Sequence, residues 1–169
     1  MKVLGLTLIM ASSAVFGITF TGLKQERINE LQSFSLLLEF IRAELSTNSR
    51  PLPELLDRIV QKLEWSAAEF IKVLILNLSA LGEKDFDTLW RESIKISVVS
   101  LNENEVDALS MLGSVLGKYD IDMQITALDE VLVLLKESER EESLQLPQAK
   151  RLNMGVSLSF GALLAIMLV

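Results

Sequence analysis

Two long uncharged stretches stand near the ends of the chain, and between them apolar residues recur at helical spacing. Val3–Leu23 and Leu152–Val169 contain no Asp, Glu, Lys or Arg. Each is long enough to cross the hydrocarbon core of a bilayer as a helix. A signal peptide is the alternative at the N-terminus, but no pair of small residues suited to cleavage stands near Thr19–Leu23. We therefore expect transmembrane helices over residues 1–23 and 152–169, on either side of a domain formed by residues 24–151.

The segment 24–151 has the period of amphipathic helices almost throughout. Apolar residues at steps of three and four predict a first helix over Gln25–Ser46. The fold class that we expect is all-α, an antiparallel bundle of about six helices between the two transmembrane helices. Local start signals predict the other five helices: one that begins at Pro53, one opened by a capping box at Ser66–Glu69, one capped by Asp85, one capped by Asn102 with Glu105, and a long one after the turn at Gly117–Asp120.

Most of the predicted helices have an apolar face that we expect to form the core of the bundle. The run "IKISVVS" (Ile94–Ser100) is rich in β-branched residues, but it is short and has no partner strand elsewhere, so we assign it to the end of the fourth helix. The residues that we expect on the apolar faces are Ile28, Leu31, Phe34, Leu38, Ile41, Leu45, Leu52, Leu55, Leu56, Ile59, Val60, Leu63, Phe86, Leu89, Trp90, Ile94, Leu109, Leu112, Leu116, Ile125, Leu128, Val131, Leu132 and Leu135.

Composition removes most catalytic chemistry. The 169 residues include no Cys and no His, so disulfides, thiolate nucleophiles and the usual general base and metal ligand are all missing. Four acidic residues suggest a magnesium site, but a helix cap and solvent-exposed faces account for them better; they are Asp120, Asp122, Asp129 and Glu130. We expect no enzyme activity, no cofactor, no metal site and no small-molecule substrate.

The chain is acidic, with 23 Asp and Glu against 16 Lys and Arg, and of these only Lys2 lies outside residues 24–151. An acidic domain disfavours nucleic acid as a partner. Basic residues beside a span favour the cytoplasmic side of the membrane. We therefore expect a cytoplasmic domain with both termini on the far side, whereas a sensor would have the reverse arrangement. The basic residues that flank the spans on the domain side are Lys24, Arg27, Lys150 and Arg151.

Small residues recur every four positions in both terminal stretches. This spacing lets helix backbones approach closely in lipid, so we expect these faces to contact each other or the spans of a partner. Gly113 and Gly117 have the same spacing in the fifth predicted helix, where they indicate close helix packing rather than a phosphate-binding loop. The residues in the terminal stretches are Ser13, Gly17 and Thr21, and Ser157, Gly161 and Ala165.

The order of these segments resembles the stage III sporulation protein AB family of endospore-forming bacteria. The resemblance covers nearly the whole chain and includes "QERINELQSFSLLLEFIRAEL", "PLPELLDRIV", "FDTLWRESI" and "LNENEVDALSMLGSVLGKYDIDMQ". The chain departs from the family pattern at Arg50 and Leu55, where Thr and Ala are usual. The most specific matching residues are Leu112, Gly113, Leu116, Gly117, Asp120 and Gln124.

This resemblance implies a structural role in the complex that joins mother cell and forespore. The domain is then similar to the cytoplasmic domains of type II secretion and type IV pilus platform proteins, the F family. The implied partners are a secretion-type ATPase, which is the stage III sporulation protein AA, other membrane subunits of the complex, and the mother-cell membrane. The alternative is a membrane-tethered sensor or regulator with an extracytoplasmic bundle. The partner-contact candidates lie in the last turn and the acidic run after it: Asp120, Gln124, Glu137, Glu139, Glu141 and Glu142.

Overall fold

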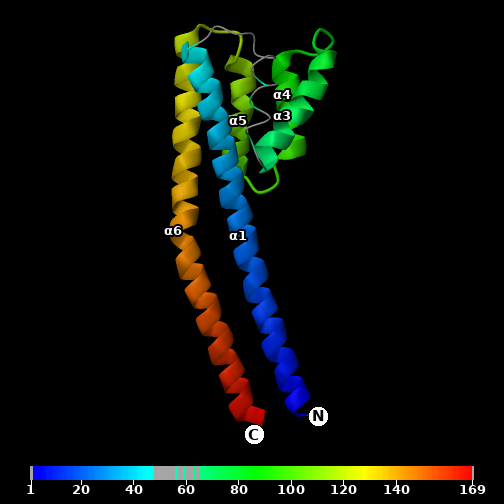
Figure 1. Ribbon diagram of the computed structural model, residues 1–169, viewed down its shortest axis with the longest axis vertical. Helices are drawn as coiled ribbons and strands as arrows, with labels where there is room; N and C mark the ends of the chain where they lie inside the picture. Colours follow the sequence, from blue (N-terminus) through cyan, green and yellow to red (C-terminus); the bar gives the residue numbers. More distant parts are fainter. Residues whose placement is uncertain (1, 48–55, 57–58, 60–62, 64, 169) are drawn as a thin grey trace. The chain divides into compact units, whose positions relative to one another are not determined.

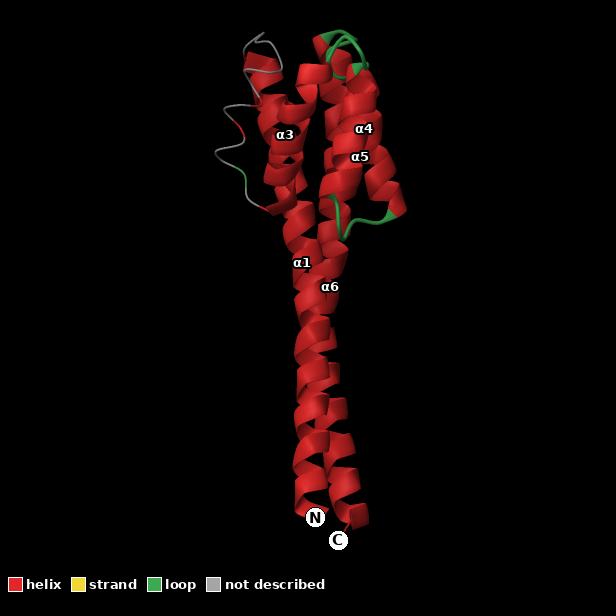
Figure 2. Cartoon of the chain, turned by 90° about the vertical axis from the view of Figure 1, so that its right-hand side faces the viewer, coloured by secondary structure: helices red, strands yellow, loops and turns green. Residues whose placement is uncertain are grey.

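The computed structural model describes residues 2–47, 56, 59, 63 and 65–168 (Figure 1). Side chains are described for residues 22–47, 56, 59, 63, 66–79 and 81–145. Figure 2 shows helices and short connections, with no strand among the described residues. The predicted all-α class is therefore confirmed for this part of the chain. Its elements are α1 (Lys2–Thr47), α3 (Trp65–Asn77), the 3₁₀ helix η2 (Leu78–Ala80), α4 (Phe86–Ser97), α5 (Glu103–Val115) and α6 (Ile121–Leu168).

The chain divides into two compact units. The first consists of Met1–Ile28 with Arg140–Val169, and the second of Asn29–Glu139. Helices α1 and α6 contribute residues to both units, whereas α3, α4 and α5 belong to the second. Where side chains are described, no helix is both long enough and apolar enough to cross a bilayer. The side chains of 1–21 and 146–169, which include nearly all of both predicted spans and all of their small-residue faces, lie outside the described residues.

The core of the second unit is built largely from the predicted apolar faces. Most of the expected residues are buried, including Leu56, Ile59 and Leu63 from the helix predicted after Pro53. Leu45, Phe86 and Ile125 are only partly buried, and Leu52, Leu55 and Val60 lie outside the described residues. Helix α3 packs against α4, and α4 against α5. To this core α3 adds five buried side chains: Ala67, Ala68, Phe70, Ile71 and Leu74.

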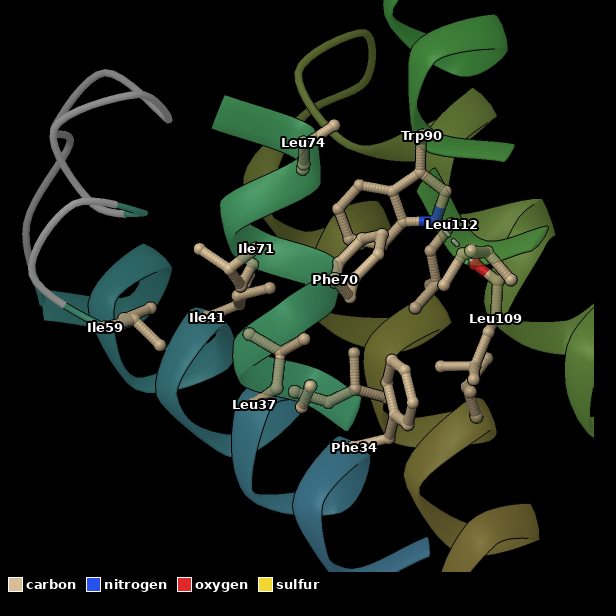
Figure 3. Packing of buried hydrophobic residues seen from close by; sticks show 14 of the residues in the cluster. Phe34, Leu37, Ile41, Ile59, Phe70, Ile71, Leu74, Trp90, Leu109 and Leu112 are labelled. Carbon is tan, nitrogen blue, oxygen red and sulfur yellow. Dashed lines mark hydrogen bonds between the residues drawn. The ribbon is translucent and has the colours of Figure 1, made fainter. Parts of the chain in front are cut away.

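Aromatic rings join three helices through the middle of this core (Figure 3). The ring of Phe34 on α1 lies 5.9 Å from that of Phe70 on α3, measured between centroids. Phe70 then meets Trp90 of α4 edge to face, at 4.8 Å and 78°, and Phe86 lies 5.7 Å from Trp90 on its own helix. Edge-to-face pairs are a favourable arrangement of ring quadrupoles. The rings therefore fix α1, α3 and α4 against one another.

Trp90 also fixes α5. Its Nε1–H donates a hydrogen bond of 2.8 Å to the carbonyl oxygen of Leu109, drawn as a dashed line in Figure 3. At Gly113 a Cβ atom would lie 2.8 Å from Trp90 Cβ, Cγ and Cδ1, so α5 can approach the indole because Gly113 has no side chain. Gly117 has a different role. Its φ of 77° lies in the left-handed region that favours glycine, in the turn that follows Leu116, the extended residue at which α5 has already ended.

Two polar side chains of α1 satisfy the backbone of other elements. Ser33 Oγ accepts a 3.2 Å hydrogen bond from Ala67 N near the start of α3. Both carboxylate oxygens of Glu30 accept from the loop after α4, one from Val99 N at 3.0 Å and one from Ser100 N at 2.5 Å. Glu30 is only 3% exposed, so these bonds satisfy a buried charge.

The predicted helix starts have different outcomes. At α5 the capping box is confirmed, because Asn102 Oδ1 accepts from Glu105 N and Glu105 Oε2 accepts from Asn102 N. The capping box at Ser66–Glu69 is wrong, since α3 begins at Trp65 and the cap comes from Ser33 on α1. Asp85 precedes α4 as predicted, although its carboxylate accepts from the Thr88 hydroxyl rather than from a backbone N–H.

The run Ile94–Ser100 is only half helical. Helix α4 ends at Ser97, and Val98 is extended. The assignment of the whole run to a helix was therefore wrong after Ser97. The reason is tertiary: Glu30 accepts from the N–H groups of Val99 and Ser100, which form a bend after the extended Val98.

The Glu30 cap should be measurable by substitution. We expect Glu30→Ala to lower the free energy of unfolding by about 1–3 kcal/mol, because the N–H groups of Val99 and Ser100 lose their acceptors. Chemical unfolding of the full chain in mild detergent measures this, and amide hydrogen exchange should become faster at the two residues. Glu26→Ala is the control, since Glu26 is exposed on the same helix. Equal losses in both variants would contradict the capping role.

The contact between Gly113 and Trp90 predicts a second difference in stability. Gly113→Val should lower the free energy of unfolding by about 1–3 kcal/mol, because the added carbons overlap the indole. Ser114→Val is the matched control one residue later, where the side chain is not buried. Thermal unfolding followed by tryptophan fluorescence compares the two. A midpoint for Gly113→Val equal to that of the control would show that α5 can move away without cost.

Candidate partner-binding surface

The side chain of Gln124 is hydrogen-bonded to the backbone of the turn between α5 and α6. Gln124 Oε1 accepts from Gly117 N at 3.1 Å, and its Nε2 donates to the carbonyl oxygen of Tyr119 at 2.6 Å. The side chain is 7% exposed. Both ends of the amide are therefore bonded to the turn. Gln124, which the sequence predicted as a partner contact, is buried and stabilises the turn instead of being exposed on its surface.

Asp120 caps α6. Its Oδ1 accepts a 2.8 Å hydrogen bond from Met123 N, and its carbonyl oxygen accepts from Gln124 N at 3.1 Å. The side chain is exposed. The carboxylate can thus cap the helix and still present an oxygen to solvent. Asp120 and Glu137 are separated along α6 by about 25 Å at 1.5 Å per residue, so the turn and the acidic run do not form one compact patch.

The acidic run divides into residues that hold α1 and residues that do not. In the second unit Glu139 Oε1 accepts from Gln32 Nε2 at 2.7 Å. In the first unit Glu142 accepts from Arg27 Nε at 2.9 Å and from Lys24 Nζ at 3.3 Å. Glu137 and Glu141 are exposed and have no hydrogen bond or ion pair in the described part of the chain. The two outward glutamates are therefore better placed for a partner.

The contacts to α1 within the second unit form a series that we call the polar ladder. It consists of Gln32–Glu139 at 2.7 Å, Glu39–Lys136 at 2.5 Å and Arg42–Asp129 at 2.5 Å. As the chain advances along α1 its partners recede along α6, so the two helices are antiparallel. Such flanking polar pairs beside an apolar seam set the register of paired helices. Sequence reasoning missed the ladder, although oppositely charged residues beside the apolar positions of both helices are a signal for it.

Glu30 is a further residue that the sequence analysis missed. It lies four positions before Phe34, at the edge of the apolar face of α1, and a charge in that position signals a buried acceptor. No group of three or more acidic residues that could hold a metal ion occurs among the described residues. In particular, Asp129 is engaged by Arg42.

A sequence model for stage III sporulation protein AB matches residues 2–169. The chain belongs to this family. Members of the stage III sporulation protein AB family are sporulation proteins, and the family is not known for enzyme activity. No curated protein sequence matches the chain significantly.

A solved structure has the same fold as this member of the stage III sporulation protein AB family. It is described as "Stage III sporulation protein AB (SpoIIIAB)" and is 23% identical in sequence, with a TM-score of 0.64. The match covers 72% of this chain and 96% of the other. At this identity the likeness supports the helical fold alone.

The ion pairs of Glu142 make stability depend on pH. Burial, the largest single effect, opposes ionisation. The hydrogen bonds from Arg27 and Lys24 and the positive charges of these two residues together outweigh it and lower the pKa of Glu142 below its ordinary value of 4.5. A carboxyl whose pKa is lower in the folded state stabilises that state above its unfolded pKa. The contribution disappears as the pH falls through the folded pKa.

We therefore expect Glu142→Gln to destabilise the chain at neutral pH, with a difference from wild type that vanishes in acid. Thermal unfolding followed by circular dichroism, at neutral pH and at pH values down to below the folded pKa of Glu142, measures this difference in stability. Glu141→Gln is the control, because Glu141 is exposed and has no ion pair among the described residues. Parallel pH curves for the two variants would mean that Glu142 contributes nothing through its charge.

Proposed function

We propose that this chain is a non-enzymatic, membrane-anchored platform subunit of the sporulation channel complex between mother cell and forespore. The observation that carries the proposal is the family match over residues 2–169. The uncharged stretches 3–23 and 152–169 suit membrane anchors, and the segment between them is then the contact surface for partners. The basic residues that flank these stretches support a cytoplasmic position for that segment.

The use of polar groups in the second unit fits a platform. Glu30, Ser33, Trp90 and Gln124 each bond to the backbone of another element or of a turn. The ladder residues likewise bond from helix to helix. These groups make the unit rigid, and rigidity is what a surface needs to bind without a large loss of conformational entropy.

The partner that we propose is the secretion-type ATPase of the system, stage III sporulation protein AA, together with other membrane subunits. The resemblance of the soluble segment to F-family platform domains supports this assignment. In that arrangement the platform supplies no chemistry. It holds the ATPase at the mother-cell membrane and transmits force or position to the other subunits.

The topology predicted by this proposal can be measured with two reporters. A fluorescent protein that folds in the cytoplasm, and alkaline phosphatase that works only after export, are each inserted between Gly82 and Glu83, two exposed residues of the turn before α4. We expect fluorescence and no phosphatase activity in sporulating cells. The reverse pattern would contradict the platform and favour an extracytoplasmic sensor.

Co-purification provides the control for this experiment. The tagged full-length chain, extracted in mild detergent from sporulating cells, should recover the AA protein. A chain without residues 152–169 tests whether membrane anchoring contributes to that recovery. Correct topology without any recovered AA protein or membrane subunit would contradict the platform role while leaving the membrane orientation intact.

A further inference from the structure

Helix α6 has a second heptad pattern, on the face that does not contact α1. Its positions are spaced by three and four residues, and all are exposed. Val133 is 64% exposed and Met123 is 53% exposed, so both apolar side chains are available to a partner. We call this the outer face of α6; it consists of Met123, Thr126, Glu130, Val133 and Glu137. These residues belong to the segment of α6 that is yellow in Figure 1.

The charges of the outer face differ from their immediate neighbours. Asp129 and Lys136, seven residues apart, are paired with Arg42 and Glu39 of α1. Glu130 and Glu137 follow them by one position, are also seven apart, and have no hydrogen bond or ion pair in the part of the chain that the structure describes. The charges on the face toward α1 are therefore paired with residues of α1, whereas the carboxylates of Glu130 and Glu137 on the outer face have no partner among the described residues.

The surface around Glu130 is hollowed, and an apolar side chain, Val133, stands between the two carboxylates. A shallow depression beside Glu130 is lined by Thr126, Asp129, Glu130 and Val133. Val133 stands three residues after Glu130 and four before Glu137, on the same face of the helix. An apolar side chain flanked by two carboxylates one heptad apart has the form of one side of a helix–helix contact.

We infer that the outer face of α6 binds a helix of another subunit of the complex. That helix has an apolar residue that packs on Val133, and Lys or Arg residues seven positions apart that pair with Glu130 and Glu137. The inference rests on the proposed function, since it assigns a surface and a partner chemistry to the platform. It differs from the acidic-run expectation, because Glu139 and Glu142 hold α1 and take no part.

The chemistry of the face disfavours two other occupants. A second copy of this chain offers one pair of basic residues seven apart, Lys84 and Arg91, and only Asp87 and Thr88 stand at the midpoint between them. Those basic residues are also engaged, Lys84 with Glu92 at 2.7 Å and Arg91 with Asp87 at 2.9 Å. Anionic lipid would be repelled by the two carboxylates.

Site-specific photocrosslinking in the full-length chain tests the inference. A photoreactive amino acid replaces Val133 in sporulating cells, and mass spectrometry identifies the crosslinked peptide. We expect a helical segment of the AA protein or a membrane subunit with Lys or Arg seven apart around an apolar residue. The same amino acid at Ile96, which is 66% exposed on α4, is the control position.

Charge reversal supplies the second part of the test. The double variant Glu130→Lys with Glu137→Lys should reduce the Val133 crosslink about tenfold, since each pair becomes repulsive. Glu83→Lys with Asp107→Lys changes net charge equally at exposed residues elsewhere and should leave the crosslink unchanged. Reversing the two basic residues of the partner segment to Glu should restore the crosslink in the Glu130→Lys, Glu137→Lys chain.

Several results would overturn the inference. One is a crosslink from position 133 to a second copy of the chain, to lipid alone or to a segment without the basic pair. Another is no crosslink from position 133. The third is an equal loss of the crosslink in both double variants. If the AA protein or a membrane subunit still co-purifies in that event, the platform function survives and only this surface is wrong. Loss of co-purification in the wild-type chain would instead contradict the platform itself.

Discussion

Burial of one face of α1 is the constraint on which the second unit depends. Leu31, Phe34, Leu38 and Ile41 are fully buried along that face. The positions beside them bond to three other parts of the chain: α6 through the polar ladder, α3 through Ser33, and the loop after α4 through Glu30. One helix thus supplies both the apolar seam and the polar groups that satisfy neighbouring backbones. Because Glu30 accepts hydrogen bonds from backbone N–H groups, its carboxylate can be almost completely buried.

The sequence predicts what depends on local physics. Helical spacing identified the buried faces of α1, α4, α5 and α6, and the Asn102–Glu105 capping box needs only residues three positions apart. Prediction from the sequence fails where a hydrogen-bond partner is distant along the chain. Ser66 had the local signature of a cap, but Ser33, 34 positions before Ala67, occupies that role. Likewise Val98–Ser100 leaves the helix because Glu30, about 70 residues earlier, accepts its N–H groups.

The same limit governs the candidate surface. Composition and the acidic run indicated a contact region on α6, and Glu137 and Glu141 are indeed exposed. Sequence alone cannot separate Asp129 from Glu130, which are neighbours with the same functional group. Their difference arises from the rotation of about 100° per residue along a helix, which turns one toward α1 and the next away from it. Only the placement of a second helix shows which carboxylates are already neutralised.

The polar ladder has a consequence for the order in which the chain acquires its structure. Its three pairs join residues 107, 97 and 87 positions apart, so α6 must be synthesised before α1 gains these contacts. Until then the apolar seam of α1 has no α6 to cover it, and contacts this distant in sequence form slowly. An emerging chain with such a seam is open to aggregation or to capture by a chaperone. The newly made protein is therefore prone to aggregation until α6 packs against α1.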